Sequence, residues 1–89
     1  MEPDFKITYT PEAREMMDVR MILTEDVEAV LRAMRETGEA VLDSESGQTI
    51  ARARIGNTTF WVGFTNEDTD SYLVHQAYSH RMQVERRNG

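Results

Sequence analysis

The side chains best suited to chemistry lie in one short run, His75-Gln76-Ala77-Tyr78-Ser79-His80-Arg81. Histidine changes its protonation state near neutral pH, so His80 can act as a general acid or base. Tyr78 can stack on a nucleobase or orient a phosphate, and Arg81 can stabilise negative charge that develops in a transition state. Cleavage of RNA by its own 2′-hydroxyl needs such a set and no metal. The other interpretation is structural: Tyr78 packs at a sheet edge while His80 and Arg81 end a strand in water.

A second group, Arg52, Arg54 and Trp61, has the composition of a binding site. Arginine binds phosphate or carboxylate through two parallel hydrogen bonds, and arginine and tryptophan are enriched among the residues that dominate interface energies. These three side chains are therefore expected to contact a partner. A cation–π pair between Arg52 and Trp61 would account for both residues without a partner, and the sequence leaves both explanations open. No metal site is expected from His75 and His80, because residues five apart point to opposite faces of a regular strand.

The dipeptide Gly56-Asn57 gives the clearest information on how these residues are positioned. It fits a two-residue hairpin loop with glycine first, between strands over residues 49–55 and 58–65. The register that follows pairs Ile55 with Thr58, Ala53 with Phe60, Ala51 with Val62 and Arg52 with Trp61. Small and apolar residues then share one face of the hairpin, and the arginines and Trp61 share the other. A slip of one residue would reverse the two faces.

Two helices are predicted before the hairpin. The first runs from Pro11 to about Arg20, with Thr10 as its cap and proline at its first position. The second begins at Thr24 and ends at Thr37-Gly38, and its apolar residues recur at helical spacing. These stripe residues are Val27, Val30, Leu31 and Met34. Four methionines, Met16, Met17, Met21 and Met34, are expected in the core.

Three further segments have the short alternating pattern of strands. Residues 4–10 predict a short strand or an extended arm, residues 40–42 a short strand, and residues 71–78 the last strand, after a polar loop over residues 66–70. For the last strand, either Leu73, His75 and Ala77 or Tyr72, Val74, Gln76 and Tyr78 face the core. We expect one α+β domain over residues 1–89, with two N-terminal helices packed on one face of a three- or four-stranded antiparallel sheet. Its ordered core would span about residues 5–82, with a frayed tail over residues 83–89.

Composition narrows the classes of function. The chain has 89 residues, a net charge of −6 and no cysteine, which excludes disulfides, thiolate metal ligands and cysteine nucleophiles. The acidic start has no apolar segment after it, and no run approaches the length of a membrane helix, so a cytoplasmic protein with no membrane contact is expected. Residues 1–48 hold twelve acids and five bases, whereas residues 49–89 hold four acids and five bases. An acidic chain is a poor nonspecific binder of nucleic acid, although its second half can offer a local anion site.

The chain resembles the small RelE/BrnT-like domains of the toxin superfamily. The resemblance rests on the runs 9–17 and 22–31, Tyr-Thr-Pro-Glu-Ala-Arg-Glu-Met-Met and Ile-Leu-Thr-Glu-Asp-Val-Glu-Ala-Val-Leu, and continues through residues 52–56 and the last strand, over roughly residues 5–82. It implies a RelE-like fold with functional side chains on the exposed sheet face and near the end of the last strand. The matching positions are Arg52, Arg54, Tyr78, His80 and Arg81. Two features depart from the family: Glu12 replaces its helix histidine, and the chain is acidic where its ribonucleases are basic.

A second resemblance is carried by Thr59-Phe60-Trp61-Val62 and by residues 74–82. These runs are similar to small proteins associated with flavin or iron–sulfur oxidoreductases in anaerobic bacteria, which implies an accessory role. The residues and both resemblances predict a non-catalytic binding or accessory module. Its expected partner is a protein of accessory or antitoxin type, a homodimer is a further expectation, and no cofactor or metal is expected. The alternative is a toxin-like endoribonuclease in which Tyr78, His80 and Arg81 are catalytic and RNA is the ligand.

Overall fold

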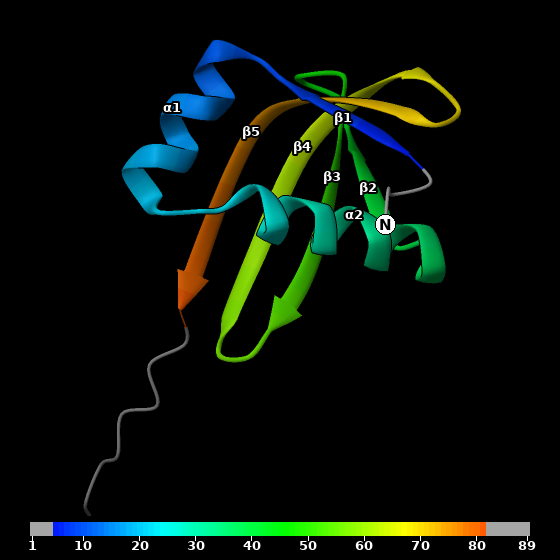
Figure 1. Ribbon diagram of the computed structural model, residues 1–89. Coiled ribbons are helices and arrows are strands. Elements are labelled where there is room, and N and C mark those ends of the chain that lie inside the picture. Colours follow the sequence, from blue (N-terminus) through cyan, green and yellow to red (C-terminus); the bar gives the residue numbers. More distant parts are fainter. Residues whose placement is uncertain (1–4, 82–89) are drawn as a thin grey trace, which may run out of the picture.

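Two helices cover one face of a five-stranded sheet in the computed structural model, which describes residues 5–81 (Figure 1). The elements are β1 (Lys6–Tyr9), α1 (Pro11–Arg20), α2 (Thr24–Thr37), β2 (Ala40–Asp43), β3 (Gln48–Ile55), β4 (Thr58–Asp68) and β5 (Ser71–Arg81). The predicted α+β class is confirmed, but the expected number of strands was too low. Within residues 5–81, neither helix is long and apolar enough to cross a membrane. The predicted tail over residues 83–89 lies outside the described residues.

The strand order is β1-β5-β4-β3-β2, so the first and last strands of the chain are neighbours. β1 runs parallel to β5, with Thr8 opposite Leu73, and the other pairs are antiparallel. The backbone N–H of Thr10 donates to the carbonyl of Val74 at 3.0 Å and prolongs this contact towards α1. Within the segment predicted as a short strand or an extended arm, Lys6–Tyr9 therefore form a paired strand.

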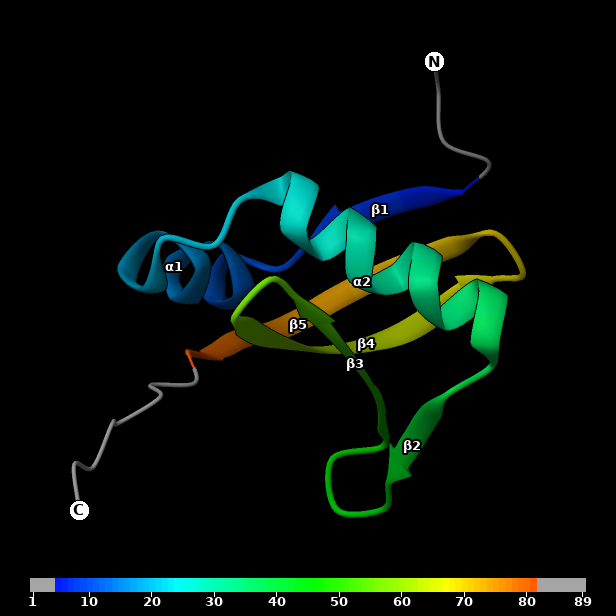
Figure 2. The ribbon, with the colours of Figure 1, turned by 90° about the horizontal axis from the view of Figure 1, so that it is seen from below.

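Both helices begin as their sequences predict. The hydroxyl of Thr10 accepts a hydrogen bond from the N–H of Ala13 at 3.0 Å, and a carboxylate oxygen of Asp26 accepts one from the N–H of Leu23 at 2.9 Å. These bonds satisfy backbone donors that a helix start leaves free. Gly38 ends α2 in the left-handed conformation at φ 75°. In Figure 2 both helices lie on the same side of the sheet.

Met21 corrects the expectation that four methionines fill the core. It ends α1 at φ 57°, a left-handed conformation that turns its side chain away from the helix stripe, and 85% of it is exposed. Met17 is buried, Met16 is half-buried, and Met34 packs against the core from α2.

The hairpin between β3 and β4 has the predicted register. Ile55 pairs with Thr58, Ala53 with Phe60, Ala51 with Val62 and Arg52 with Trp61. Gly56 adopts φ 64° in the loop, as a glycine at the first central position allows. The face that carries Ala51, Val62 and Phe64 is buried beneath Val27, Val30 and Leu31 of α2.

The last strand differs from both predicted alternatives because it changes phase. Gly63 pairs with Gln76 but Phe64 pairs with Val74, so β5 carries a β-bulge at this point. The extra residue lets Tyr72 and Val74 face the core before the bulge and Ala77 face it afterwards. The loop predicted over residues 66–70 was also too long, since β4 continues to Asp68.

Candidate binding face on the open side of the sheet

The residues predicted to form a site lie mostly on the sheet face that the helices leave uncovered. Strand register places Arg52, Trp61 and Tyr78 in one cross-strand row. Arg54, Thr59 and His80 form the next row. Alternation along the strands turns both rows away from the buried residues Ala51, Val62 and Ala77. We call the surface made by these two rows the open face.

An aromatic stack lies at the centre of the open face. The rings of Trp61 and Tyr78 are nearly parallel, with centroids 5.4 Å apart and planes inclined by 13°. Both side chains are half-buried. The sequence did not predict this pair, because the bulge in β5 sets which residue of the last strand lies opposite Trp61. No local signal in the sequence marks that bulge.

The arginines of the open face are exposed. Arg54 donates from Nε to the carbonyl of Gly56 at 3.1 Å and so lies against the hairpin loop. Within residues 5–81, the cation–π contacts involve Arg14, Arg32 and Arg35, and Arg52 takes part in none. The cation–π pair between Arg52 and Trp61, one of the two explanations left open by the sequence, is therefore not formed, and Tyr78 stacks on the indole.

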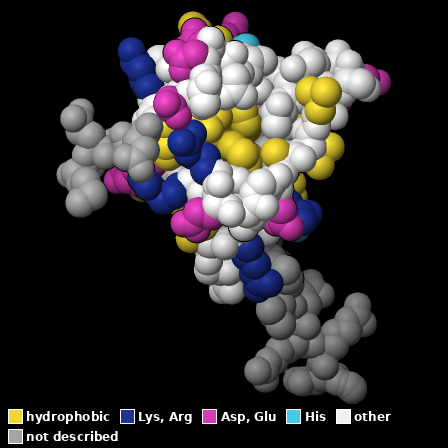
Figure 3. Space-filling model, turned by 90° about the vertical axis from the view of Figure 1, so that its right-hand side faces the viewer, with side chains coloured by type: hydrophobic (Ala, Val, Ile, Leu, Met, Phe, Trp, Pro, Cys, Tyr) yellow, Lys and Arg dark blue, Asp and Glu magenta, His cyan; other side chains and the backbone are white. Residues whose placement is uncertain are grey.

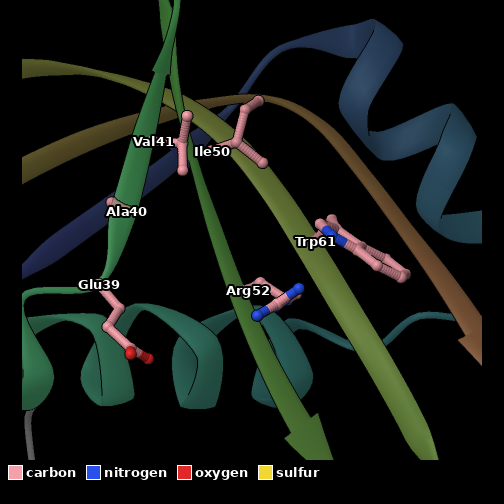
Figure 4. Close-up of a pocket in the computed structure, with 6 residues that line it drawn as sticks. All are labelled: Glu39, Ala40, Val41, Ile50, Arg52 and Trp61. Atoms are coloured by element: carbon pink, nitrogen blue, oxygen red, sulfur yellow. The ribbon is translucent and has the colours of Figure 1, made fainter.

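A groove of about 390 Å³ crosses the open face beside the stack (Figure 4). Its lining residues are Glu39, Ala40, Val41, Ile50, Arg52 and Trp61. In Figure 4 the side chain of Arg52 lies between Glu39 and Trp61, with Val41 and Ile50 beyond it. The groove thus has one acidic group, one basic group and apolar walls. Glu39 and Val41 were not identified from the sequence as site residues, because the sequence predicted no pairing partner for the short strand that begins at residue 40.

The part of the sheet next to the bulge, on the same side as the open face, is polar. Gln76 donates from Nε2 to Oε1 of Gln48 at 2.9 Å, and the two amides close over Gly63. The hydroxyl of Thr65 and Nε2 of His75 are 2.9 Å apart and share a hydrogen bond. These groups bond to one another, so this part of the face offers a partner fewer unsatisfied polar groups than the groove does.

The predicted catalytic residues are only partly brought together. Tyr78 and His80 occupy adjacent rows of the open face, and His80 is exposed. The backbone of Arg81 pairs with Thr58, and that register position belongs to the opposite face. The bulge also places His75 on the same face as His80, contrary to the expectation for a regular strand. At about 3.3 Å per residue the two lie about 16 Å apart along β5, too far to share a metal ion.

No protein-family model, curated protein or solved structure matches the chain. What the open face does is therefore inferred from its own residues.

Proposed function

We propose that the protein is a non-catalytic binding module that holds a protein partner on its open face. The observation that carries the proposal is the Trp61–Tyr78 stack, which neither helix of the described residues covers and which lies in the same row as Arg52. Aromatic rings and arginine dominate the binding energy of many interfaces. The groove beside the stack supplies an apolar surface for the same partner.

The charge of the chain favours a protein over a nucleic acid as that partner. Nonspecific binding of RNA or DNA depends on neutralising phosphates, whereas this chain has a net charge of −6. The open face has two exposed arginines, Arg52 and Arg54, among its described residues. Two arginines suffice for a carboxylate or a single phosphate, but not for a long track of backbone phosphates.

The second candidate function is cleavage of RNA on the same face. It is favoured by the position of His80, one row from Tyr78 and in the same row as Arg54. In that function His80 accepts the proton of the 2′-hydroxyl, whose oxygen attacks the phosphorus to form a 2′,3′-cyclic phosphate, while the 5′-oxygen of the next nucleotide leaves and takes up a proton from water. Arg54 holds the phosphate and Tyr78 stacks on a base.

Expression of the protein separates the two functions. A binding module leaves growth unaffected and releases no nucleotides from purified RNA. A ribonuclease arrests growth, and His80→Ala abolishes both the arrest and the cleavage. Toxicity that His80→Ala removes would overturn the binding module.

The binding function is then tested on partners that co-purify from the native host. Trp61→Ala and Arg52→Glu should each weaken recovery of the same partner at least tenfold. Trp61→Phe keeps an aromatic ring and should retain binding, and Arg20→Glu makes the same charge change at the exposed end of α1. Equal recovery by all four variants would exclude the open face. Far-UV circular dichroism confirms that each variant is folded.

A further inference from the structure

The edge strand β2 is the least protected part of the sheet. It is the last strand in the order, and no strand of the described part of the chain pairs with its outer side. Its sequence is Ala-Val-Leu-Asp, and 69% of Val41 and 68% of Leu42 are exposed. Edge strands usually carry lysine, proline or a bulge that blocks further pairing. β2 has no lysine, proline or bulge, so its protection is limited to its length of four residues and the charge of Asp43, and it offers free backbone groups beside two exposed apolar side chains.

Both faces of β2 are uncovered for a structural reason. α2 packs on β3 and β4, and in Figure 2 β2 diverges from α2 and lies beyond its cover. Leu42 therefore stays exposed although its partner Thr49 lies on the helix side of the sheet. Val41 lies on the open side and lines the groove with Ile50 and Trp61. Figure 3 views the molecule from the side on which β2 lies, and hydrophobic side chains gather at the centre of that view, with charged side chains around them.

Acidic residues surround this strand. The segment over residues 36–51 contains four acids, Glu36, Glu39, Asp43 and Glu45, and no base. Asp43 lies two positions after Val41 in β2, so alternation puts both on the same face, and Glu39, just before β2, lines the groove with Val41. The Asp43 carboxylate also accepts hydrogen bonds from the N–H of Glu45 at 3.2 Å and from the hydroxyl of Ser46 at 2.9 Å. A chain that pairs with β2 meets an apolar residue between two carboxylates.

We propose that β2 binds an extended segment of a partner protein, which adds as a sixth strand with the pattern basic–apolar–apolar–apolar–basic. The inference rests on the proposed binding function and names the class of partner. The central residue of the segment lies beside Val41 and packs its apolar side chain against it, on the side of the sheet where Val41 lines the groove. The two basic residues lie opposite Glu39 and Asp43, and backbone hydrogen bonds to β2 hold the segment in place.

A second copy of this chain fits the same edge poorly. In an antiparallel pair of two β2 strands, each residue of one copy lies opposite a residue of the other. The two sheets join with continuous faces only when the side chains of opposed residues point to the same side of the sheet. The register centred on Val41 sets Glu39 against Asp43 twice. The register centred on Leu42 sets the apolar Val41 against the charged Asp43 twice. Like charges directly opposite each other are destabilising, so the complement of this edge is a basic segment.

The test uses a synthetic fluorescent peptide, Ser-Lys-Val-Leu-Val-Lys-Ser, and the full chain, with binding followed by fluorescence anisotropy. Two N-methylated forms are compared, one methylated on alternate residues and the other on the residues between them. Only one of the two sets of N–H groups points at β2 in an added strand. We expect one form to bind at least tenfold more weakly and the other to bind within about twofold of the unmodified peptide. Equal effects of the two methylation patterns would overturn strand addition.

Protein variants locate the site. Val41→Lys should weaken peptide binding at least tenfold, whereas Val19→Lys, at a site on α1 that is 77% exposed, should leave it unchanged. A peptide with glutamate in place of both lysines should bind at least tenfold more weakly. Equal binding by Val41→Lys and Val19→Lys, or no binding of the unmodified peptide at millimolar concentration, would overturn the inference. So would a dimer of the protein that Val41→Lys dissociates, since the second copy would then occupy the edge.

Failure of this inference is distinguishable from failure of the proposed function. If Trp61→Ala releases the native partner but Val41→Lys does not, the open face binds the partner and the edge does not. If Val41→Lys abolishes peptide binding while Trp61→Ala and Arg52→Glu leave the partner bound, the edge is a binding site and the open face is not.

Discussion

Gly63 lies where the open face has no room for a side chain. A Cβ atom built there would lie 2.6 Å from Oε1 of Gln48 and 2.6 Å from Cγ of Gln76. The hydrogen bond between the two amides could not keep its geometry beside that atom. Glycine is thus favoured here by the close approach of two glutamine side chains and not by backbone conformation, since the φ of Gly63 is not positive.

Gly63→Ala is expected to lower the free energy of unfolding by about 1–3 kcal/mol, the usual cost of inserting an extra carbon into a packed site. Urea denaturation monitored by Trp61 fluorescence measures the change. The double variant Gly63→Ala/Gln76→Ala removes the crowded side chain and should recover part of the loss. Additive destabilisation by the two substitutions would show that crowding at Gln76 is not the cause.

Tyr9 gives the stability of the fold a dependence on alkaline pH. Burial raises its pKa above the ordinary value of 10.0, Arg14 opposes this, and the charge of Glu28 adds to it. The neutral phenol is therefore the form that the folded state favours. The stabilisation that comes from the neutral phenol of Tyr9 is fully present below pH 10 and is lost as the pH rises through the raised pKa.

The free energy of unfolding should therefore fall above about pH 10, and it should fall less steeply in Tyr9→Phe, which has no proton to lose. Urea denaturation at a series of pH values up to about 12 measures both slopes. Identical slopes for the two proteins would show that Tyr9 does not titrate differently in the folded and unfolded states.

At the scale of elements, one arginine of α2 joins three parts of the fold. The guanidinium of Arg35 lies 4.9 Å from the ring centre of Phe5, just before β1, and donates to the hydroxyl of Tyr72 in β5 at 2.8 Å. It also donates to a carboxylate oxygen of Asp70 at 3.3 Å, in the turn before β5. Phe5 packs edge-on against Tyr72 with ring centres 5.6 Å apart. This cluster keeps β1 in place at the edge of the sheet.

Arg35→Ala should lower the free energy of unfolding, because it removes the hydrogen bonds to Tyr72 and Asp70 and the cation–π contact with Phe5. Arg35→Lys keeps the charge but not the planar fork, so it should lose at least half as much. Arg20→Ala, at the exposed end of α1, should change stability by less than about 0.5 kcal/mol. Full stability in Arg35→Lys would mean that charge alone holds the cluster.

Local elements were predictable from the sequence and their long-range pairing was not. The cap at Thr10, the stop at Gly38 and the register set by Gly56-Asn57 depend on residues close in the chain, and all three are confirmed. The bulge in β5 depends on how Gln76 and Val74 pack against β4, which no residue nearby in the sequence reveals. The Trp61–Tyr78 stack and the groove follow from that pairing and from the place of β2 at the edge.

At the scale of the whole molecule, negative charge is concentrated on the helix side and at the β2 edge. Exposed acids of the helices include Glu12, Glu15, Asp18 and Glu25. Two ion pairs within 4 Å connect described residues, Arg32 with Glu28 and Arg35 with Asp70, so most of the acids are not paired in this way. An excess of like charge destabilises a compact state.

Salt should therefore stabilise the protein. Between about 0.01 M and 0.1 M NaCl the screening length falls from about 30 Å to about 10 Å. We expect the melting temperature to rise by about 3 °C, equivalent to roughly 0.5 kcal/mol for a domain of this size. Differential scanning calorimetry measures the shift. A melting temperature that falls with salt would mean that the two ion pairs outweigh the general repulsion.

The side-by-side position of the first and last strands also determines how the domain responds to mechanical force. β1 and β5 run in the same direction, so a pull on the start of β1 and on the end of β5 slides one strand along the other. The hydrogen bonds between them then bear the load together, whereas strands peeled apart from one end break their bonds one after another. When the chain is pulled from both ends, the pairing of β1 with β5 would therefore resist the force, because this short pairing joins the beginning of the fold to its end.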